Sequence, residues 1–251
     1  MIEKLHSFLT DKGLELNYTL SNPTNGVYLT TLIDYTTSFT SFGKGETKID
    51  ALLSAYGEMC ERILTKNYFE EYYIDGLYKD AKITEFLNDK LKTEYKIEEL
   101  QKEDLIDFNS DSFEILSIPF LEKSTSKTVY FPINLLQNLY ASNGMAFHYD
   151  LNKAYYNAKT EIIERFVKFD VLRYGLPLCP IKHSLNSASI QIYDATLDGK
   201  YPVMAASFIE DNEIILSFGC DLNRETAIKK AYLELWQSEL RESNPIINKG
   251  F

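Results

Sequence analysis

The sequence predicts an α/β fold of the α+β type, in which a strand–turn–helix unit occurs three times around an acidic cleft. Three helical stretches carry the same pattern of alanine and glutamate. Runs rich in β-branched and aromatic residues, bounded by turn residues, lie between them and are typical of strands. Apolar residues make up 45% of the 251-residue chain and charged residues 25%. This composition is that of a globular protein with a sizeable core.

The first part of the chain is expected to form a helix and then a β-rich run. Residues 2–16 place apolar side chains on one side, as in a short amphipathic helix. Residues 27–42 read VYLTTLIDYTTSFTSF, which predicts one long strand or a hairpin. Gly43 and Gly45 are expected to end it.

The next helix is expected over residues 47–73. Thr47 and Asp50 have the spacing of a capping box, with Asp in place of the usual Glu or Gln. Residues 75–127 are highly charged and are expected to form one or two surface helices with loops.

The second half is expected to contain further strands and two helices. The predicted elements, in order, are an extended stretch over 128–139, a turn over 142–144, a helix over 150–173, a loop with Pro177 and Pro180, strands over 188–193, 202–209 and 213–218, a turn at Gly219, and a helix over 223–242. The sequence has no linker rich in Gly, Ser or Pro between these elements. We therefore expect a single domain spanning residues 1–251.

The repeat consists of two alanines four residues apart, followed by acidic or amide residues three residues apart. Each copy is expected to follow a strand and a glycine turn, at Gly45, Gly144 and Gly219. The copies are Ala51, Ala55, Glu58, Glu61 and Arg62; Ala154, Ala158, Glu161, Glu164 and Arg165; and Ala227, Ala231, Glu234 and Gln237.

The spacing gives this pattern a physical meaning. Residues three or four apart share one face of a helix, so each acidic pair lies side by side. Two carboxylates about 4 Å apart repel by about 4 kcal/mol at an effective dielectric of 20. Converging carboxylates therefore need a counter-ion, and Mg²⁺ shared with nucleotide phosphates is a common one. The alternative is that each pair lies on a solvated helix face, as single copies of such a pattern usually do.

Charge and cysteine content exclude several classes of protein. With 26 Lys and Arg against 37 Asp and Glu, the net charge is −11, which is unlike a general nucleic-acid binder. Cys60, Cys179 and Cys220 are far apart, which fits a reducing compartment. Cys220 is expected at a helix start, where a thiolate is favoured. The charged N-terminus and the lack of a long apolar run favour a cytoplasmic protein without a membrane span.

The motifs resemble those of the YcaO family, over nearly the whole chain. The segments that carry the resemblance are GKGETKIDALLSAYGEMCERILTKNYF (43–69), VYFPINLLQNLYASNGMAF (129–147), TEIIERFVK (160–168), YPVMAASF (201–208) and SFGCDLNRETAIKKAYLELWQ (217–237). The similarity is greatest to the branch associated with methylthiolation of a small-subunit ribosomal protein.

The resemblance implies an ATP- and Mg²⁺-binding fold that activates a peptide backbone amide by phosphorylating its oxygen, leading to an azoline or a thioamide. It assigns Mg²⁺ to the glutamates of the first two copies, and it leaves the catalytic residues unassigned. The implied nucleotide- and metal-binding residues are Ser54, Glu58, Glu61, Arg62, Glu161, Glu164, Arg165, Glu234 and Gln237, with Glu58, Glu61, Glu161 and Glu164 as the metal ligands.

The chain also departs from the family pattern. Tyr149 and Lys153 stand where the family has Asn and Glu in its metal–nucleotide site, and Glu239 stands where it usually has a phosphate-facing Arg. The family's extreme N-terminal and C-terminal parts are expected to be missing. A Lys at a ligand position reverses the local charge, so weak or absent ATP binding is expected. Lys44, in a Gly-Lys-Gly segment that lacks P-loop spacing, is a further candidate to face phosphate.

Two functions therefore remain open from the sequence. One is an ATP- and Mg²⁺-dependent amide-activating protein, as an accessory factor in ribosomal-protein methylthiolation. The other is a degenerate module, a candidate pseudoenzyme, that binds a protein or peptide without ATP-dependent catalysis, with Lys153 neutralising the acidic cluster. The expected partners are a peptide or ribosomal-protein substrate or a partner enzyme, and a homodimer is possible because apolar faces would otherwise be uncovered.

Overall fold

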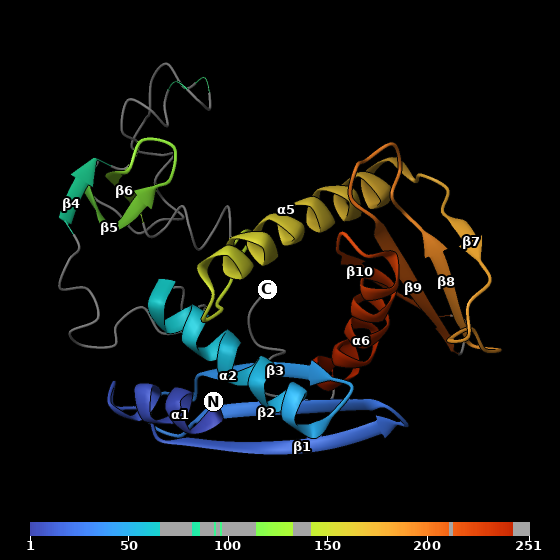
Figure 1. Ribbon diagram of the computed structural model, residues 1–251, viewed down its shortest axis with the longest axis horizontal. Coiled ribbons are helices and arrows are strands. Elements are labelled where there is room, and N and C mark those ends of the chain that lie inside the picture. The colour runs from blue at the N-terminus through green and yellow to red at the C-terminus, as the bar shows by residue number, and fades with distance from the viewer. Residues whose placement is uncertain are drawn as a thin grey trace. The chain divides into compact units, whose positions relative to one another are not determined.

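The computed structural model describes residues 1–65, 82–85, 93, 96, 114–132, 142–210 and 213–242 (Figure 1). The chain forms two compact units, one of residues 1–61 and 143–251 and the other of residues 62–142. The mixed helix and sheet content confirms the expected α/β fold. No helix in these ranges is both long enough and apolar enough to cross a membrane.

The first sheet of the first unit contains the expected hairpin. Helix α1 (Ile2–Thr10) precedes strands β1 (Leu16–Thr24), β2 (Val27–Asp34) and β3 (Thr40–Gly45), which pair antiparallel in the order β1-β2-β3. The helix expected over residues 2–16 ends at Thr10, and the chain turns at Gly13, which has a φ of +91°. Strand β1 was not expected, since most of its residues are exposed and give no apolar alternation.

Glycines within β3 allow a helix to pack closely on the sheet. Gly43 lies inside the strand, although it was expected to end it, whereas Gly45 is the last residue of the strand, as expected. Helix α2 (Lys48–Thr65) begins after Thr47, whose hydroxyl donates to Asp50 Oδ2 (2.7 Å) and accepts from the Asp50 N–H (3.2 Å). The expected capping contact is thus present. The last part of the expected helix, residues 66–73, lies outside the described residues.

The second sheet contains the three expected strands and one more. Strands β7 (Cys179–Ile181), β8 (Ile190–Asp194), β9 (Val203–Glu210) and β10 (Glu213–Cys220) pair antiparallel in the order β10-β9-β8-β7. Strand β7 replaces part of the expected proline loop; its Pro180 lies in this short edge strand, where proline is tolerated. Gly219 lies within β10, so the strand reaches Cys220 instead of turning at the glycine.

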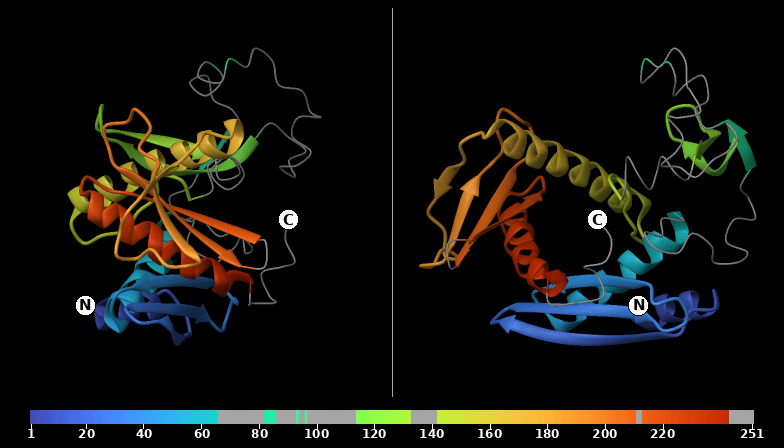
Figure 2. Two further views of the ribbon diagram at one scale, coloured as in Figure 1. Left: turned by 90° about the vertical axis from the view of Figure 1, so that its right-hand side faces the viewer. Right: turned by 180° about the vertical axis from the view of Figure 1, so that it is seen from behind.

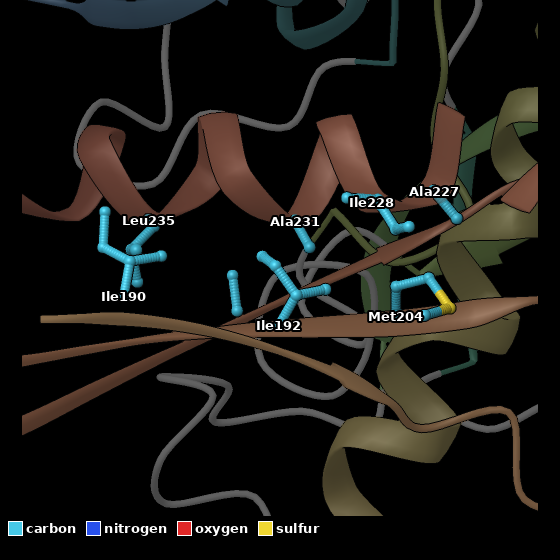
Figure 3. Close-up of a cluster of buried hydrophobic side chains, with 8 residues drawn as sticks. Ile190, Ile192, Met204, Ala227, Ile228, Ala231 and Leu235 are labelled. Carbon is cyan, nitrogen blue, oxygen red and sulfur yellow. The ribbon is translucent and has the colours of Figure 1, made fainter. Parts of the chain in front are cut away.

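Two helices cover opposite faces of this second sheet. Helix α5 (Leu151–Tyr174), capped by Asp150, packs Val167 and Val171 against Val203, Ala205 and Phe218. Helix α6 (Arg224–Glu242) packs on the alternate residues, such as Met204 and Ala206 (Figure 3). Successive side chains of a strand point to opposite faces, so the two core clusters lie on the two sides of β9.

Helix α6 also reaches the first sheet. It contacts β9 and β10 on one side and β2 and β3 on the other, so that it lies between the two sheets (Figures 1 and 2). This position brings the acidic residues of α6 close to the end of β3.

The second unit contains a small antiparallel sheet in its described part. Its strands are β4 (Lys82–Glu85), β5 (Glu114–Glu122) and β6 (Lys127–Pro132), in the order β4-β5-β6. The expectation of surface helices and loops over residues 75–127 is wrong for β4 and β5, since the charged flanks concealed the short run EILSIPFLE. The extended stretch expected over 128–139 is a strand as far as Pro132, and residues 133–139 lie outside the description.

Candidate functional site

Two of the three predicted repeats pack in the same way. In the first, the buried Ser41 of β3 donates its hydroxyl proton to the Ala55 carbonyl of α2 (2.9 Å). In the second, Ser217 of β10 donates to the Ala231 carbonyl of α6 (2.7 Å). The four alanines of these two helices, at 51, 55, 227 and 231, are fully buried.

Glycine makes this close approach possible in both repeats. A Cβ placed on Gly43 would lie 2.0 Å from the Ala51 carbonyl oxygen, and one on Gly219 would lie 2.5 Å from the Ala227 carbonyl oxygen. Such distances leave no room for any side chain. The glycine and alanine positions are therefore explained by packing, and the acidic residues need a separate explanation.

The copy on α5, which is the second along the chain, departs from this packing. The described residues before it, 142–150, form the expected turn and then an irregular segment. Ala154 and Ala158 are only half-buried. A Cβ on Gly144 would meet only the Ile162 side chain, although its φ of +75° confirms the expected turn. The sequence pattern thus recurs in α5, but its alanines do not support the same close contact with a strand.

The segment before each helix nevertheless contacts the helix of another repeat. Lys44, near the end of β3, reaches α6. The Cys220 N–H, at the end of β10, donates to Glu164 of α5 (3.2 Å). Phe147, in the segment before α5, lies 3.8 Å from the Cβ position of Gly57 in α2. These three contacts form a cycle, which agrees with the predicted threefold arrangement.

Lys44 contacts two of the predicted residues on α6. Its ammonium forms an ion pair with Glu234 and donates to Gln237 Oε1 (2.6 Å). The charge of Lys44 also acts on Glu164 of α5. One ammonium therefore interacts with acidic or amide side chains of two of the predicted helices.

The other glutamates are held by backbone N–H groups or by arginine. Glu58 of α2 lies beside β3, where it accepts from the Phe42 N–H (3.4 Å). Glu161 accepts from the Gly144 N–H (3.2 Å) and pairs with Arg165 (2.7 Å). Each of these carboxylates has a fixed donor that orients it, as charge-assisted hydrogen bonds do.

Burial and nearby charge act against each other at Glu164. Burial raises the pKa of this carboxyl above its ordinary value of 4.5, while the charges of Lys44 and Lys230 and the Cys220 N–H oppose the rise. The net shift is upward, so desolvation outweighs these favourable interactions. A further cation beside Glu164 would favour its ionised form.

The remaining predicted residues have varied surroundings. Ser54 is exposed on α2, while Glu61 and Arg62 are partly buried on the same helix. Lys153 is exposed and uses its backbone N–H to cap α5 on Asp150. The ammonium that contacts Glu234 and Gln237 thus belongs to Lys44, whereas the sequence suggested Lys153 as the neutralising residue.

Tyr149 and Glu239, which depart from the family pattern, have no described contact with the acidic residues. Tyr149 is 53% exposed, and its ring packs edge-on against Phe147. The side chain of Glu239 lies outside the described part of the chain.

Cys220 does not have the environment of a reactive thiolate. It is buried at the end of β10, and burial together with the charge of Glu164 raises its pKa to about 11. The expected position of Cys220 at a helix start is therefore wrong, because Cys220 is the last residue of β10 and α6 begins only at Arg224. Cys60, between the glutamates of α2, is also buried, and burial raises its pKa to about 12.

The donor chemistry of this set fits Mg²⁺. Carboxylate and amide oxygens are its usual protein ligands, and it is commonly held by only one or two carboxylates together with phosphate oxygens. Within the described residues, no group of three or more His, Cys, Asp or Glu side chains is spaced to hold a metal ion. A preformed protein cage is not required for a metal that is shared with a nucleotide, so the fit rests on the fixed oxygens of Glu58, Glu161 and Glu164.

Sequence reasoning identified the acidic residues but not their donors. Backbone N–H groups of Phe42, Gly144 and Cys220 hold three of the glutamates, and a backbone donor has no sequence signal of its own. Lys44 was a candidate to face phosphate, but its contact with α6 depends on the packing of two distant segments. The alternation of β3 could have suggested it, because Lys44 points away from the face that packs on α2.

Comparison with known proteins gives a family match over most of the chain. The family described as YcaO cyclodehydratase, ATP- and Mg²⁺-binding, matches residues 42–245. The chain is 29% identical over 234 residues to the ribosomal protein S12 methylthiotransferase accessory factor YcaO of Escherichia coli. It is 28% identical over 236 residues to an uncharacterized protein of Haemophilus influenzae. Each match covers 78% of this chain and 40% of the relative, so the chain spans well under half the length of these curated relatives.

Two solved structures share the fold. A YcaO protein of Methanopyrus kandleri, bound with AMPPCP and Mg²⁺, matches with a TM-score of 0.63 and 15% identity, over 96% of this chain and 68% of that one. A heterocyclase in complex with substrate and cofactor matches with a TM-score of 0.62 and 17% identity, over 94% of this chain and 39% of that one.

Proposed function

The chain belongs to the YcaO family, and we propose that it is an ATP- and Mg²⁺-binding module that activates a peptide backbone amide, acting as an accessory factor in ribosomal-protein methylthiolation. The similarity to the Escherichia coli accessory factor supports the choice of substrate class. Because the chain spans 40% of that relative, the activity and partners of the longer protein are part of the proposal.

The observation that carries this proposal is the grouping of oriented acidic side chains around the end of β3. Glu58 lies beside this strand. Glu234 and Gln237 of α6 contact the ammonium of Lys44. The positive charge of the same lysine opposes the rise in the pKa of Glu164 on α5. Residues on separate solvated faces would not share one ammonium. The shared lysine therefore favours a common site for the acidic residues of α5 and α6 over independent solvated faces of these two helices.

Each residue has a defined part in the proposed site. Glu58, Glu61, Glu161 and Glu164 would hold Mg²⁺ through their carboxylates, and Arg165 orients Glu161 through its ion pair. Ser54, Arg62, Glu234 and Gln237 would line the nucleotide. When bound, ATP supplies the phosphoryl group that turns the amide oxygen into a leaving group.

Calorimetry with Mg²⁺–ATP tests this function. If this function is correct, and in contrast to the weak or absent ATP binding expected from Lys153 in the sequence, the unmodified chain should bind with a dissociation constant in the micromolar range. Glu161→Gln should bind at least about tenfold more weakly, a loss of about 1.4 kcal/mol. Glu46→Gln is the matched control, because Glu46 forms an exposed pair with Lys229 and is not one of the proposed ligands. Absence of binding, or equal affinity of the Glu161 variant and the unmodified chain, would contradict the proposal.

A second function is the degenerate module that binds a protein or peptide without ATP-dependent catalysis. Two observations favour it: Lys44 already neutralises Glu234, and Lys153 stands where a metal-ligating Glu is expected. On this alternative Mg²⁺–ATP binds weakly or not at all, and the double substitution Lys153→Glu with Glu239→Arg restores binding. A micromolar dissociation constant for the unmodified chain would exclude it.

A further inference from the structure

Lys44 connects two elements that are far apart in sequence. It lies on β3, and its ammonium engages Glu234 and Gln237 on α6. The Lys44 side chain is 25% exposed and that of Glu234 is 33% exposed. Partly buried ion pairs are screened less by solvent than exposed ones, so this contact is stronger than a typical surface pair.

The contact is not needed for the packing of the repeat. In the β10–α6 repeat, the position equivalent to Lys44 is Cys220, which has no charged side chain. Ser217 and Gly219 nevertheless pack on α6 as the equivalent residues of β3 pack on α2. A second bridge, between Lys229 of α6 and Glu46, also joins α6 to the end of β3, on the exposed surface (2.9 Å). Lys44 is therefore distinguished by the residues that it contacts, which are those of the acidic motif.

We propose that Lys44 is an exchangeable internal cation of the acidic site, which holds Glu234 and Gln237 until a divalent metal and nucleotide replace it. This inference rests on the proposed function and adds a positioning residue to it. Both acceptor oxygens are hard ligands of the kind that Mg²⁺ prefers, and they are engaged by the ammonium.

Charge explains why the two cations compete. An ammonium and a divalent ion held in one site repel each other, so the metal and its nucleotide gain Glu234 and Gln237 only if Lys44 leaves them. Displacement costs the metal part of its binding free energy. The displaced ammonium then needs a new anionic partner, which the phosphates of a nucleotide provide.

Thermal unfolding with Mg²⁺ alone, without nucleotide, tests the exchange. Lys44→Met removes the charge and keeps most of the length of the side chain. We expect this variant to be less stable than the unmodified chain without metal, to gain more in melting temperature on Mg²⁺ addition, and to reach half of this gain at a Mg²⁺ concentration at least about tenfold lower.

Matched variants separate the charge from the loss of a bridge. Lys229→Met breaks the other bridge between α6 and the end of β3, and it should respond to Mg²⁺ as the unmodified chain does. Lys44→Arg keeps the charge and should also respond as the unmodified chain. An equal or smaller response of Lys44→Met would overturn the proposal, as would a Lys229→Met response as large as that of Lys44→Met.

The outcome can be separated from that of the proposed function. A larger Mg²⁺ response of Lys44→Met in a chain that does not bind Mg²⁺–ATP would support the exchange and contradict the function. A chain that binds Mg²⁺–ATP, but whose Lys44→Met variant shows no larger response to Mg²⁺, would support the function and overturn the exchange. If Lys44→Met does not fold, Lys44→Gln takes its place, and failure of both to fold even with excess Mg²⁺ would show that Lys44 is structural and not exchangeable.

Discussion

The β3–α2 and β10–α6 repeats have the same packing but different chemistry at the strand end. In each, a buried serine binds a helix carbonyl and a glycine lets the helix approach the strand. At the next position of the strand, the first repeat has Lys44 and the second has Cys220. The position that faces the repeat's own helix is thus limited to glycine by space, whereas the next position faces the other side of the sheet, where Lys44 contacts α6 and Cys220 is buried against α5.

The largest effect is expected from filling the space at the two glycines. Gly43→Ala and Gly219→Ala would each place a Cβ within 2.5 Å of helix backbone atoms, which a rotamer change cannot relieve. We expect a loss of about 3 kcal/mol or more in the free energy of unfolding for each variant, measured by urea denaturation. Similar losses at both sites would support the equivalence of the repeats.

Gly57→Ala provides the control for these glycine variants. Gly57 lies inside α2, and its Cβ would be 3.8 Å from Phe147, an ordinary contact distance. Alanine is favoured over glycine inside a helix by about 0.5–1 kcal/mol, so this variant should be more stable than the unmodified chain. A tolerated Gly43→Ala or Gly219→Ala substitution would show that the helix contact is less tight than described.

A smaller effect is expected at the paired serines. Ser41→Ala and Ser217→Ala each remove one hydrogen bond to a helix carbonyl, and each should lose about 1 kcal/mol of stability. Ser217 also lies 3.2 Å from the Ala206 carbonyl, but a hydroxyl has one proton and can fully satisfy only one acceptor. Urea unfolding of the two variants should therefore give matching losses; a neutral effect at one serine would break the equivalence.

The sequence predicted the repeat because its residues have a strict physical role. Small residues four apart leave a pattern on the helices that can be recognised without coordinates. The three strands of the second sheet were predicted from runs of β-branched and aromatic residues. Strands β1 and β7 were missed, because β1 is largely exposed and β7 contains a proline. From the local sequence alone, a polar segment such as β1 and a proline-containing segment such as β7 both predict loops.

The candidate site was predictable only in its acidic residues. The position of Lys44 on Glu234 and Gln237 depends on α6 lying between two sheets, which is a property of the tertiary fold. The repeat on α5 keeps its acidic residues without the packing. Glu161 and Glu164 occur at the expected positions, although Ala154 and Ala158 are only half-buried. In α5, the acidic pattern is thus retained without the tight strand contact seen in the other two repeats.

The last prediction concerns pH and compares Glu164 with an exposed glutamate. Because burial raises the pKa of Glu164 in the folded chain above its ordinary value of 4.5, the folded state keeps a proton there that the unfolded state has already lost. The unfolded state then binds fewer protons, so the free energy of unfolding decreases as the pH rises from 4.5 through the raised value.

Glu164→Gln should remove this part of the pH dependence. The amide oxygen of the variant can still accept from the Cys220 N–H, while no buried charge forms at neutral pH. Urea unfolding between pH 4 and pH 8, compared with the exposed control Glu46→Gln, should give a flatter profile for Glu164→Gln and stability at pH 8 at least equal to that of the unmodified chain. A variant that is less stable at pH 8 would mean that Lys44 and Lys230 favour the ionised carboxylate more than burial opposes it, and that the acidic pair of α5 is charged before any metal binds.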